Sequence, residues 1–367
     1  MVLTNSDAAW MAQIEQGPEE VRRLMLSVLA QVPTSEARLS GPRDSADTTF
    51  AKWQQVKVRD KVAVDHEEPL PLTHFDAVSE HPREFWRLNA CTIETKEQKK
   101  LLLEDPEKLC SKNRYADIIP FRHSRVHLLP RASVAAKDAY VDGYINANFV
   151  DGPIGEPGNR KIIASQGPDY LTFMDHWRMI AQENVTLIVT TCKEVEQLRP
   201  KCFHYWPFEP ELECQTRSGE SKYATWQEGM QSHNMEVTRA APDVQLADGL
   251  ILRKLLLTDR DLGVSGRQIC QLHFLAWPDH GVPESESQAA FTQMLEILTY
   301  MLLSSDQTEK ALVHCSAGIG RTGTTVALTH LLVQLYAQRN TPEMAAEPKL
   351  SVFSTIRRLR EQRFNMI

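Results

Sequence analysis

After residue 112, short apolar runs alternate with longer amphipathic segments. The apolar runs are rich in β-branched and aromatic residues, and several are apolar enough to be strands buried on both faces. They lie at residues 160–166, 185–192, 250–259, 267–277 and 310–316. Four other segments have apolar residues three and four positions apart and predict helices at residues 170–183, 287–305, 323–338 and 351–364. The alternation predicts a mixed α/β domain.

The first quarter of the chain has a different pattern. Residues 18–32 have Pro18 in a first-turn position and apolar residues at helical spacing, which predicts one amphipathic helix. Residues 33–72 are polar, carry many loop-forming residues and show little periodicity. We therefore expect residues 1–75 to be an N-terminal extension with one helix and a polar linker.

A second folding unit is expected at residues 76–367. Helical patterns return at residues 81–90 and 95–110, the latter interrupted by a proline. Two polar stretches, residues 209–244 and residues 339–349, are expected to be surface insertions.

Composition and charge exclude several classes of protein. Of the 367 residues, 42% are hydrophobic and 24% are charged, which is ordinary for a folded soluble protein. A formal net charge of −7 provides no general attraction to nucleic acid or to an anionic membrane. No apolar window approaches the roughly 20 residues of a membrane helix, and no secretory signal pattern is present. We expect a cytoplasmic protein with no membrane span and no nucleic-acid partner.

The seven cysteines are scattered and include no CxxC pair. This spacing indicates neither a disulfide scaffold nor a zinc site, and it fits a reducing compartment.

Residues 313–323, with the sequence VHCSAGIGRTG, combine a strand end, a glycine-rich loop and the start of a helix. In such a loop the backbone N–H groups converge on an anion, and the helix dipole favours negative charge. The same features favour the thiolate form of Cys315 at the start of the loop. Arg321 adds a planar fork of donors that suits two oxygens of a phosphoryl group.

The neighbours of Cys315 admit more than one interpretation. A lone cysteine is most often a small buried hydrophobic residue, but the complete spacing is hard to obtain by chance. Thr322 could donate a hydrogen bond to the sulfur. His314 could hold the loop through backbone carbonyls, or it could be an ordinary core histidine. The expected contacts of the bound anion are the loop residues Ser316, Ala317, Gly318, Ile319 and Gly320.

Six segments, in the same order along the chain, resemble motifs of the cysteine-dependent protein tyrosine phosphatases. They are KNRYADIIPF (112–121), YINANFV (144–150), ASQGP (164–168), KCFHYWP (201–207), HFLAWPDHGVP (273–283) and VHCSAGIGRTG (313–323). The motifs are specific, favour the tyrosine-specific branch, and cover the chain from about residue 80 onward. The resemblance implies an α/β fold with a highly twisted mixed central sheet, helices on both sides and a strand, phosphate loop and helix at the active site.

The resemblance also implies a mechanism without cofactor or metal. Cys315 would take the phosphoryl group while Arg321 holds its oxygens. Asp279, next to His280 on a loop anchored by Trp277, would first protonate the leaving phenolate and then activate water. Taken alone, Asp279 would be interpreted as a solvated turn residue.

Residues 112–117 would select the substrate. The ring of Tyr115 could stack on phosphotyrosine and line a slot too deep for phosphoserine to reach the cysteine, although an isolated tyrosine is more often a half-buried core residue. The resemblance implies that Asp117 accepts hydrogen bonds from the substrate backbone and that Glu196 orients Arg321. Ala116 stands where many family members carry a long side chain, so we expect a weaker grip on acidic flanking residues.

One departure from the family pattern lies at the end of the chain. The segment LREQRFNMI (359–367) stops just before a glutamine that, in the family, positions the hydrolytic water. The catalytic domain is therefore expected to be cut short. The alternative function is that of a phosphotyrosine-binding pseudophosphatase, which captures substrates without efficient turnover. Asn365 disfavours a second phosphotyrosine site. The expected partners are tyrosine-phosphorylated proteins, and a monomer is expected.

Overall fold

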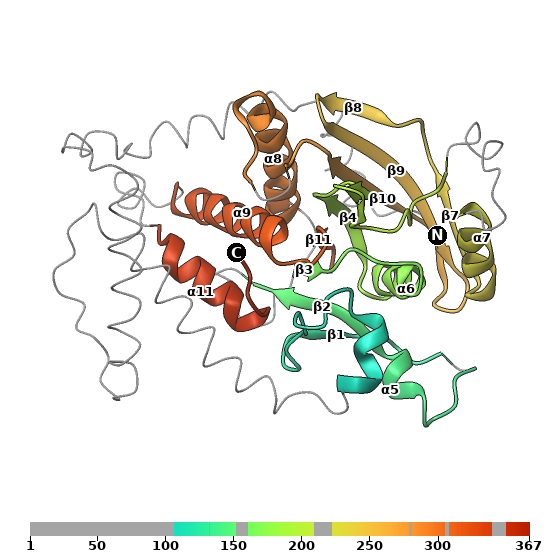
Figure 1. The fold of residues 1–367 in the computed structure, drawn as a ribbon. Helices are drawn as coiled ribbons and strands as arrows, with labels where there is room; N and C mark the ends of the chain where they lie inside the picture. The colour runs from blue at the N-terminus through green and yellow to red at the C-terminus, as the bar shows by residue number, and fades with distance from the viewer. Residues whose placement is uncertain are drawn as a thin grey trace, which may run out of the picture.

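A mixed sheet runs through the centre of the molecule, as Figure 1 shows for this computed structural model. The structure describes residues 106–131, 133–151, 161–208, 222–278, 281–304, 308–339 and 350–367. Within these residues the sheet has nine strands in the order β1-β2-β3-β11-β4-β10-β9-β7, and β8 pairs with β9. The strands are β1 (Arg125–His127), β2 (Tyr144–Val150), β3 (Ile162–Ser165), β4 (Val185–Thr190), β7 (Met235–Arg239), β8 (Val244–Ala247), β9 (Leu250–Asp259), β10 (Val264–Phe274) and β11 (Lys310–His314).

The centre of the sheet is parallel. Strands β3, β11, β4 and β10 run in the same direction, whereas the outer pairs are antiparallel. Every residue of β4 is buried, as expected of a parallel strand covered on both faces. His314, the last residue of β11, is in register with Ser165 of β3 and Thr190 of β4. The carboxyl ends of these three strands therefore meet at one edge, where Cys315 follows.

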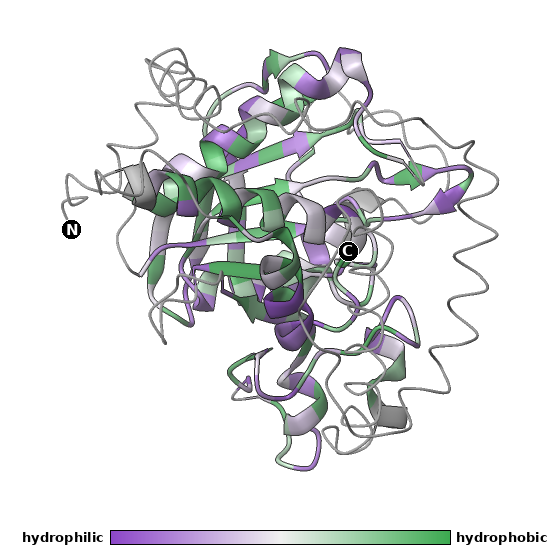
Figure 2. Cartoon of the chain, turned by 90° about the vertical axis from the view of Figure 1, so that its left-hand side faces the viewer, coloured by the Kyte–Doolittle hydropathy of each residue, from purple (hydrophilic) through white to green (hydrophobic). Residues whose placement is uncertain are grey.

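Helices cover both faces of the sheet (Figure 1). On one side lie α8 (Gln288–Ser304), α9 (Gly320–Arg339) and α11 (Val352–Gln362), and on the other α6 (Phe173–Gln182) and α7 (Lys222–Ser232). Short turns add η2 (Pro106–Lys112), α5 (Ala139–Asp142) and η3 (Ser285–Ser287). Each side has its own apolar core, and the colouring in Figure 2 shows hydrophobic residues concentrated along the strands and on the helices packed against them. None of the helices that the structure describes is both long and apolar enough to cross a membrane.

The predicted α/β class, mixed twisted sheet and flanking helices are confirmed. Each of the five predicted strands and four predicted helices overlaps an observed element of the same type. The predicted helices at 18–32 and 81–90, and most of that at 95–110, lie outside the described residues, as do the extension at 1–75 and nearly all of 339–349.

The expectation that residues 209–244 form a surface insertion is wrong for the described part of that stretch. Residues 222–232 form helix α7, which buries Trp226 and Met230, and β7 pairs with β9 at the end of the sheet. The error has a physical reason, because α7 packs through few apolar side chains and its sequence is otherwise polar.

Candidate active site

The loop that contains Cys315 connects β11 to α9 and turns beneath the ends of the parallel strands. Cys315 is buried, and the backbone N–H of Gly318 points at its sulfur, with a nitrogen-to-sulfur distance of 3.3 Å. Gly318 has φ +72°, and a β-carbon there would lie 2.1 Å from the carbonyl oxygen of Ser165. Only glycine lets the loop approach β3 so closely.

Arg321 lies in the first turn of α9 and is held by an acid from another part of the chain. Its two terminal nitrogens donate to the two carboxylate oxygens of Glu196, at 2.6 and 2.8 Å. Glu196 belongs to a hairpin of β5 (Val195–Glu196) and β6 (Arg199–Pro200). Burial lowers the pKa of Arg321, but the hydrogen bond and charge of Glu196 outweigh burial, and the net pKa is raised. The guanidinium is therefore a fixed cation beside the loop.

The segment that follows β10 also reaches Arg321. The carbonyl oxygen of Pro278 accepts a hydrogen bond from Arg321 at 3.3 Å. Trp277 is buried, donates its indole N–H to the carbonyl oxygen of Gly281 at 2.9 Å, and meets the ring of Phe291 edge-on. Asp279 and His280 lie outside the described residues. The residues on either side, Pro278 and Gly281, are held by these hydrogen bonds.

His314 makes the backbone contact expected of it, whereas Thr322 does not make its expected contact with the sulfur. His314 is fully buried, its Nδ1 lies 3.1 Å from the carbonyl oxygen of Cys315, and its Nε2 lies 2.7 Å from the Tyr205 hydroxyl. Burial lowers the pKa of His314 to about 4, so the ring is neutral, with Nδ1 donating and Nε2 accepting. The hydroxyl of Thr322 is buried without a hydrogen-bond partner among the described residues, so the expected bond to the sulfur is not formed.

Tyr115 lies against the phosphate loop. Its hydroxyl is 2.9 Å from the side-chain oxygen of Ser316. Its ring and Ile319 pack on a small core cluster of Ile118, Phe121 and Phe364. Asp117, two residues farther on, is exposed at the surface.

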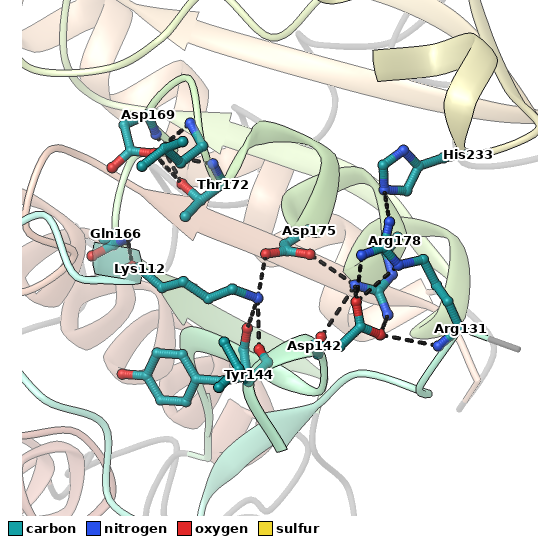
Figure 3. Close-up of polar contacts among 12 residues, drawn as sticks. Lys112, Arg131, Asp142, Tyr144, Gln166, Asp169, Thr172, Asp175, Arg178 and His233 are labelled. Atoms are coloured by element: carbon teal, nitrogen blue, oxygen red, sulfur yellow. Dashed lines mark hydrogen bonds and ion pairs between the residues drawn. The ribbon is translucent and has the colours of Figure 1, made fainter. Parts of the chain in front are cut away.

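Lys112, three residues before Tyr115, is anchored by a network of ion pairs. Lys112 pairs with Asp175 of α6 at 2.9 Å, and Asp175 in turn pairs with Arg178 at 2.8 Å (Figure 3). Arg178 and Arg131 both bind Asp142, at 2.8 and 2.7 Å, which extends the network to α5.

Asn113 and Arg114 fix the segment to strand β2 and to the residues that follow β3. Asn113 accepts hydrogen bonds from Tyr144 and Asn146 of β2, at 2.6 and 2.8 Å. Arg114 donates to the carbonyl oxygen of Gly167 at 2.9 Å, and the N–H of Gly167 donates to the carbonyl oxygen of Ser316 at 2.9 Å. These contacts fix the backbone just before Tyr115, whose hydroxyl contacts Ser316 of the loop.

Sequence reasoning missed one residue that supports the loop. Arg363, just after α11, is fully buried and donates to the carbonyl oxygens of Gly318 and Ala317, at 2.7 and 3.1 Å. Its other bonds go to the side chains of Asn148 and Asn146, at 2.7 and 3.0 Å. Burial lowers the pKa of Arg363 to about 10, although the charges of Cys315 and Tyr144 oppose this shift.

The structure brings together most of the predicted site residues. Cys315, Arg321, Glu196, Ser316 and Tyr115 meet at the carboxyl edge of the parallel strands. Gly320 has open space around it. Among the described residues, one buried group could hold a metal ion: Cys192, Cys202 and His314.

In this geometry a loop amide points at the thiol of Cys315, and Glu196 fixes Arg321 nearby. Comparison with known proteins agrees with the fold and with this arrangement of motifs. The sequence model of the protein-tyrosine phosphatase family matches residues 110–367. The chain belongs to the protein-tyrosine phosphatase family.

Two human relatives illustrate the similarity. The chain is 32% identical to tyrosine-protein phosphatase non-receptor type 12 over 288 residues, 78% of this chain and 32% of the relative. It is 33% identical to receptor-type tyrosine-protein phosphatase alpha over 287 residues, 77% of this chain and 30% of the relative. The chain thus spans about a third of the length of these relatives.

Solved structures agree. The catalytic domain of human protein tyrosine phosphatase non-receptor type 18 is 28% identical, with a TM-score of 0.57 over 76% of this chain and 87% of that one. A complex of that phosphatase with a HER2 phosphopeptide is 30% identical, with a TM-score of 0.58 over 76% and 90% of the two chains.

Proposed function

We propose that the chain hydrolyses phosphotyrosine in proteins through a cysteinyl-phosphate intermediate. The observation that carries this proposal is the two-point pairing of Arg321 with Glu196 beside the buried sulfur of Cys315. A guanidinium fixed in this way needs no rearrangement to bind the oxygens of a transferring phosphoryl group.

In the first step, the Cys315 sulfur attacks phosphorus and the bond to the tyrosine oxygen breaks. Loop amides and Arg321 stabilise the charge on the three remaining oxygens, and Asp279 supplies the proton that the phenolate takes up. In the second step, Asp279 accepts a proton from water, which attacks phosphorus and releases the cysteine and inorganic phosphate. The contact between Pro278 and Arg321 supports this role for Asp279, because Asp279 is the next residue.

Substrate choice is proposed to depend on the depth of a slot that the ring of Tyr115 lines above the phosphate loop. Its hydroxyl contact with Ser316 and the anchoring of residues 112–114 support a rigid wall for an aromatic slot. Phosphoserine lacks the length to cross such a slot. Asp117 is exposed, which allows it to accept hydrogen bonds from a peptide backbone, and the similar phosphatase of type 18 forms complexes with HER2 phosphopeptides.

His314 and Glu196 are proposed as positioning residues rather than proton carriers. Neutral His314 holds the carbonyl of Cys315, and Glu196 holds Arg321. A cytoplasmic location, expected from composition and cysteine usage, and a monomeric state both stay predictions.

The experiment measures phosphate release from a phosphotyrosine peptide in the presence of EDTA, with Cys315→Ser as control. Steady turnover that is lost in Cys315→Ser supports the proposal. A single burst that stalls after one phosphoryl group per chain supports the alternative, a pseudophosphatase that captures substrate. Equal rates for the wild type and Cys315→Ser would overturn both.

A further inference from the structure

Two thiols and an imidazole gather beneath the phosphate loop. Cys192 follows β4, Cys202 follows β6 and His314 ends β11, and their sulfur and nitrogen atoms all lie within 4.8 Å of one another. Their exposed fractions are 2%, 4% and 0%. The proposed hydrolysis uses neither thiol.

We propose that Cys192, Cys202 and His314 form a binding site for a thiophilic divalent metal ion of the zinc type. Two sulfurs and one imidazole nitrogen are a ligand set that such ions prefer. Metal-to-sulfur bonds of about 2.3 Å in a tetrahedral site place ligand atoms about 3.5–3.8 Å apart, so the three atoms need to close by only about 1 Å.

Charge balance favours the ion in this buried place. Both thiols are buried, so a thiolate left there without a counter-charge would be costly. Binding replaces the two thiol protons, which leave to solvent, with one divalent cation. The resulting unit of two thiolates and one ion is neutral, which a dry interior tolerates far better than a lone charge.

Possible oxygen ligands and a groove also lie near the cluster. The hydroxyls of Tyr205 and Thr190 lie 2.7 and 3.0 Å from Nε2 of His314 and can supply a fourth ligand. A groove of about 430 Å³ lies next to the cluster and is lined by Lys193 and His273. Lys193 follows Cys192 in the chain, and Nε2 of His273 lies 2.8 Å from the carbonyl oxygen of Cys192.

Metal binding would reach the catalytic loop without occupying the substrate slot. Coordination at either nitrogen of His314 replaces a hydrogen bond, to Cys315 on one side or to Tyr205 and Thr190 on the other. Cys192 and Cys202 also flank the hairpin that carries Glu196, the partner of Arg321. The ion would therefore couple to the loop through both of its positioning residues.

The test uses Cd²⁺ as the probe and the full chain with every cysteine except Cys192, Cys202 and Cys270 changed to serine. This variant lacks Cys315, so hydrolysis plays no part in the result. The expected result is one ion per chain, with the ultraviolet charge-transfer absorption of two cadmium-bound thiolates and displacement by Zn²⁺. Cys192→Ser or Cys202→Ser in this background should weaken binding at least tenfold, and Cys270→Ser, a buried thiol outside the cluster, should leave it unchanged.

Each contrary result has a definite meaning. Binding that survives both Cys192→Ser and Cys202→Ser, or absorption that reports no thiolate ligand, would overturn the proposal. Far-ultraviolet circular dichroism identifies a serine variant that fails to fold. In that case ¹¹³Cd NMR of the parent variant decides, because two sulfur ligands and one nitrogen give a shift distinct from that of oxygen ligands. An oxygen-type shift would reject the site.

Discussion

Gly318 has no tolerance for a side chain. Its backbone has φ +72°, and a β-carbon would lie 2.1 Å from the oxygen and 2.4 Å from the carbon of the Ser165 carbonyl. The clashing atoms belong to the backbone of β3, which cannot move aside as a flexible side chain can. Gly318→Ala should therefore lower the free energy of unfolding by more than about 3 kcal/mol. Urea denaturation measures this. Gly320→Ala is the control for stability, because a β-carbon there meets nothing within 4 Å; equal losses in both variants would contradict the prediction.

Glu196 should matter for rate more than for stability. Removing its carboxylate frees Arg321 to leave the position it holds beside Cys315. Misplacement of such a group by about 1 Å can lower the rate about 100-fold, so we expect Glu196→Ala to reduce kcat/KM on a phosphotyrosine peptide by that order. Glu196→Gln keeps one acceptor oxygen and should lose less.

A surface ion pair provides the comparison for Glu196. Glu236 pairs with Arg260 at 3.0 Å, and both side chains are exposed. Exposed pairs contribute little, so Glu236→Ala should leave kcat/KM unchanged. A Glu196→Ala enzyme as active as Glu236→Ala would show that Arg321 is positioned by something else.

Which residues could be recognised from sequence depended on local spacing. Cys315 and Arg321 belong to one short motif, so the sequence alone was enough to single them out. Arg363 was missed because residues 357–363 contain four arginines, and nothing in the sequence tells which of them are buried. Its partners lie on β2 and in the phosphate loop, which only the fold brings to it.

At the scale of elements, the end of α11 acts as a support for the phosphate loop. Arg363→Met removes the donor to two loop carbonyl oxygens and to the side-chain oxygens of Asn146 and Asn148, and it leaves each of these acceptors without that hydrogen bond. We expect a loss of about 3–5 kcal/mol in the free energy of unfolding, with reduced turnover. Arg357→Met within α11 breaks only an exposed pair with Glu361 and should cost less than about 0.5 kcal/mol. Denaturation curves that shift equally would refute the supporting role.

The elements that could be predicted from the sequence were those with extensive burial, such as strands covered on both faces of the sheet. Strands β4 and β11 are mostly apolar and almost wholly buried, so they were predicted as strands, and α8 was predicted from its helical periodicity. β7 and α7 were missed because a sheet edge and a lightly packed helix need few apolar residues. The metal-type cluster was missed for another reason, since His314 is distant from both cysteines along the chain and only the strand order joins them.

At the scale of the whole molecule, buried histidines make the fold sensitive to acid. Burial lowers the pKa of His314 and His330 to about 4, and burial with the charge of Arg253 lowers that of His273 to about 3. The unfolded chain has ordinary histidines that take up protons near pH 6.5. Between pH 6.5 and about 4 the unfolded state therefore binds more protons, and stability must fall as pH falls through this window.

The size of this effect can be tested at one position. Each such histidine adds roughly 1.4 kcal/mol of lost stability per pH unit within the window. His330 lies in α9, and its Nε2 has no hydrogen-bond partner among the described residues, so His330→Gln removes the titration without breaking a contact of that atom. The free energy of unfolding is measured by urea denaturation from pH 7.5 to pH 4.5. In His330→Gln its dependence on pH should be shallower than in the wild type by about 1.4 kcal/mol per pH unit. A His330→Gln slope equal to that of the wild type would contradict the prediction, because it would mean that His330 takes up its proton alike in the folded and unfolded chains.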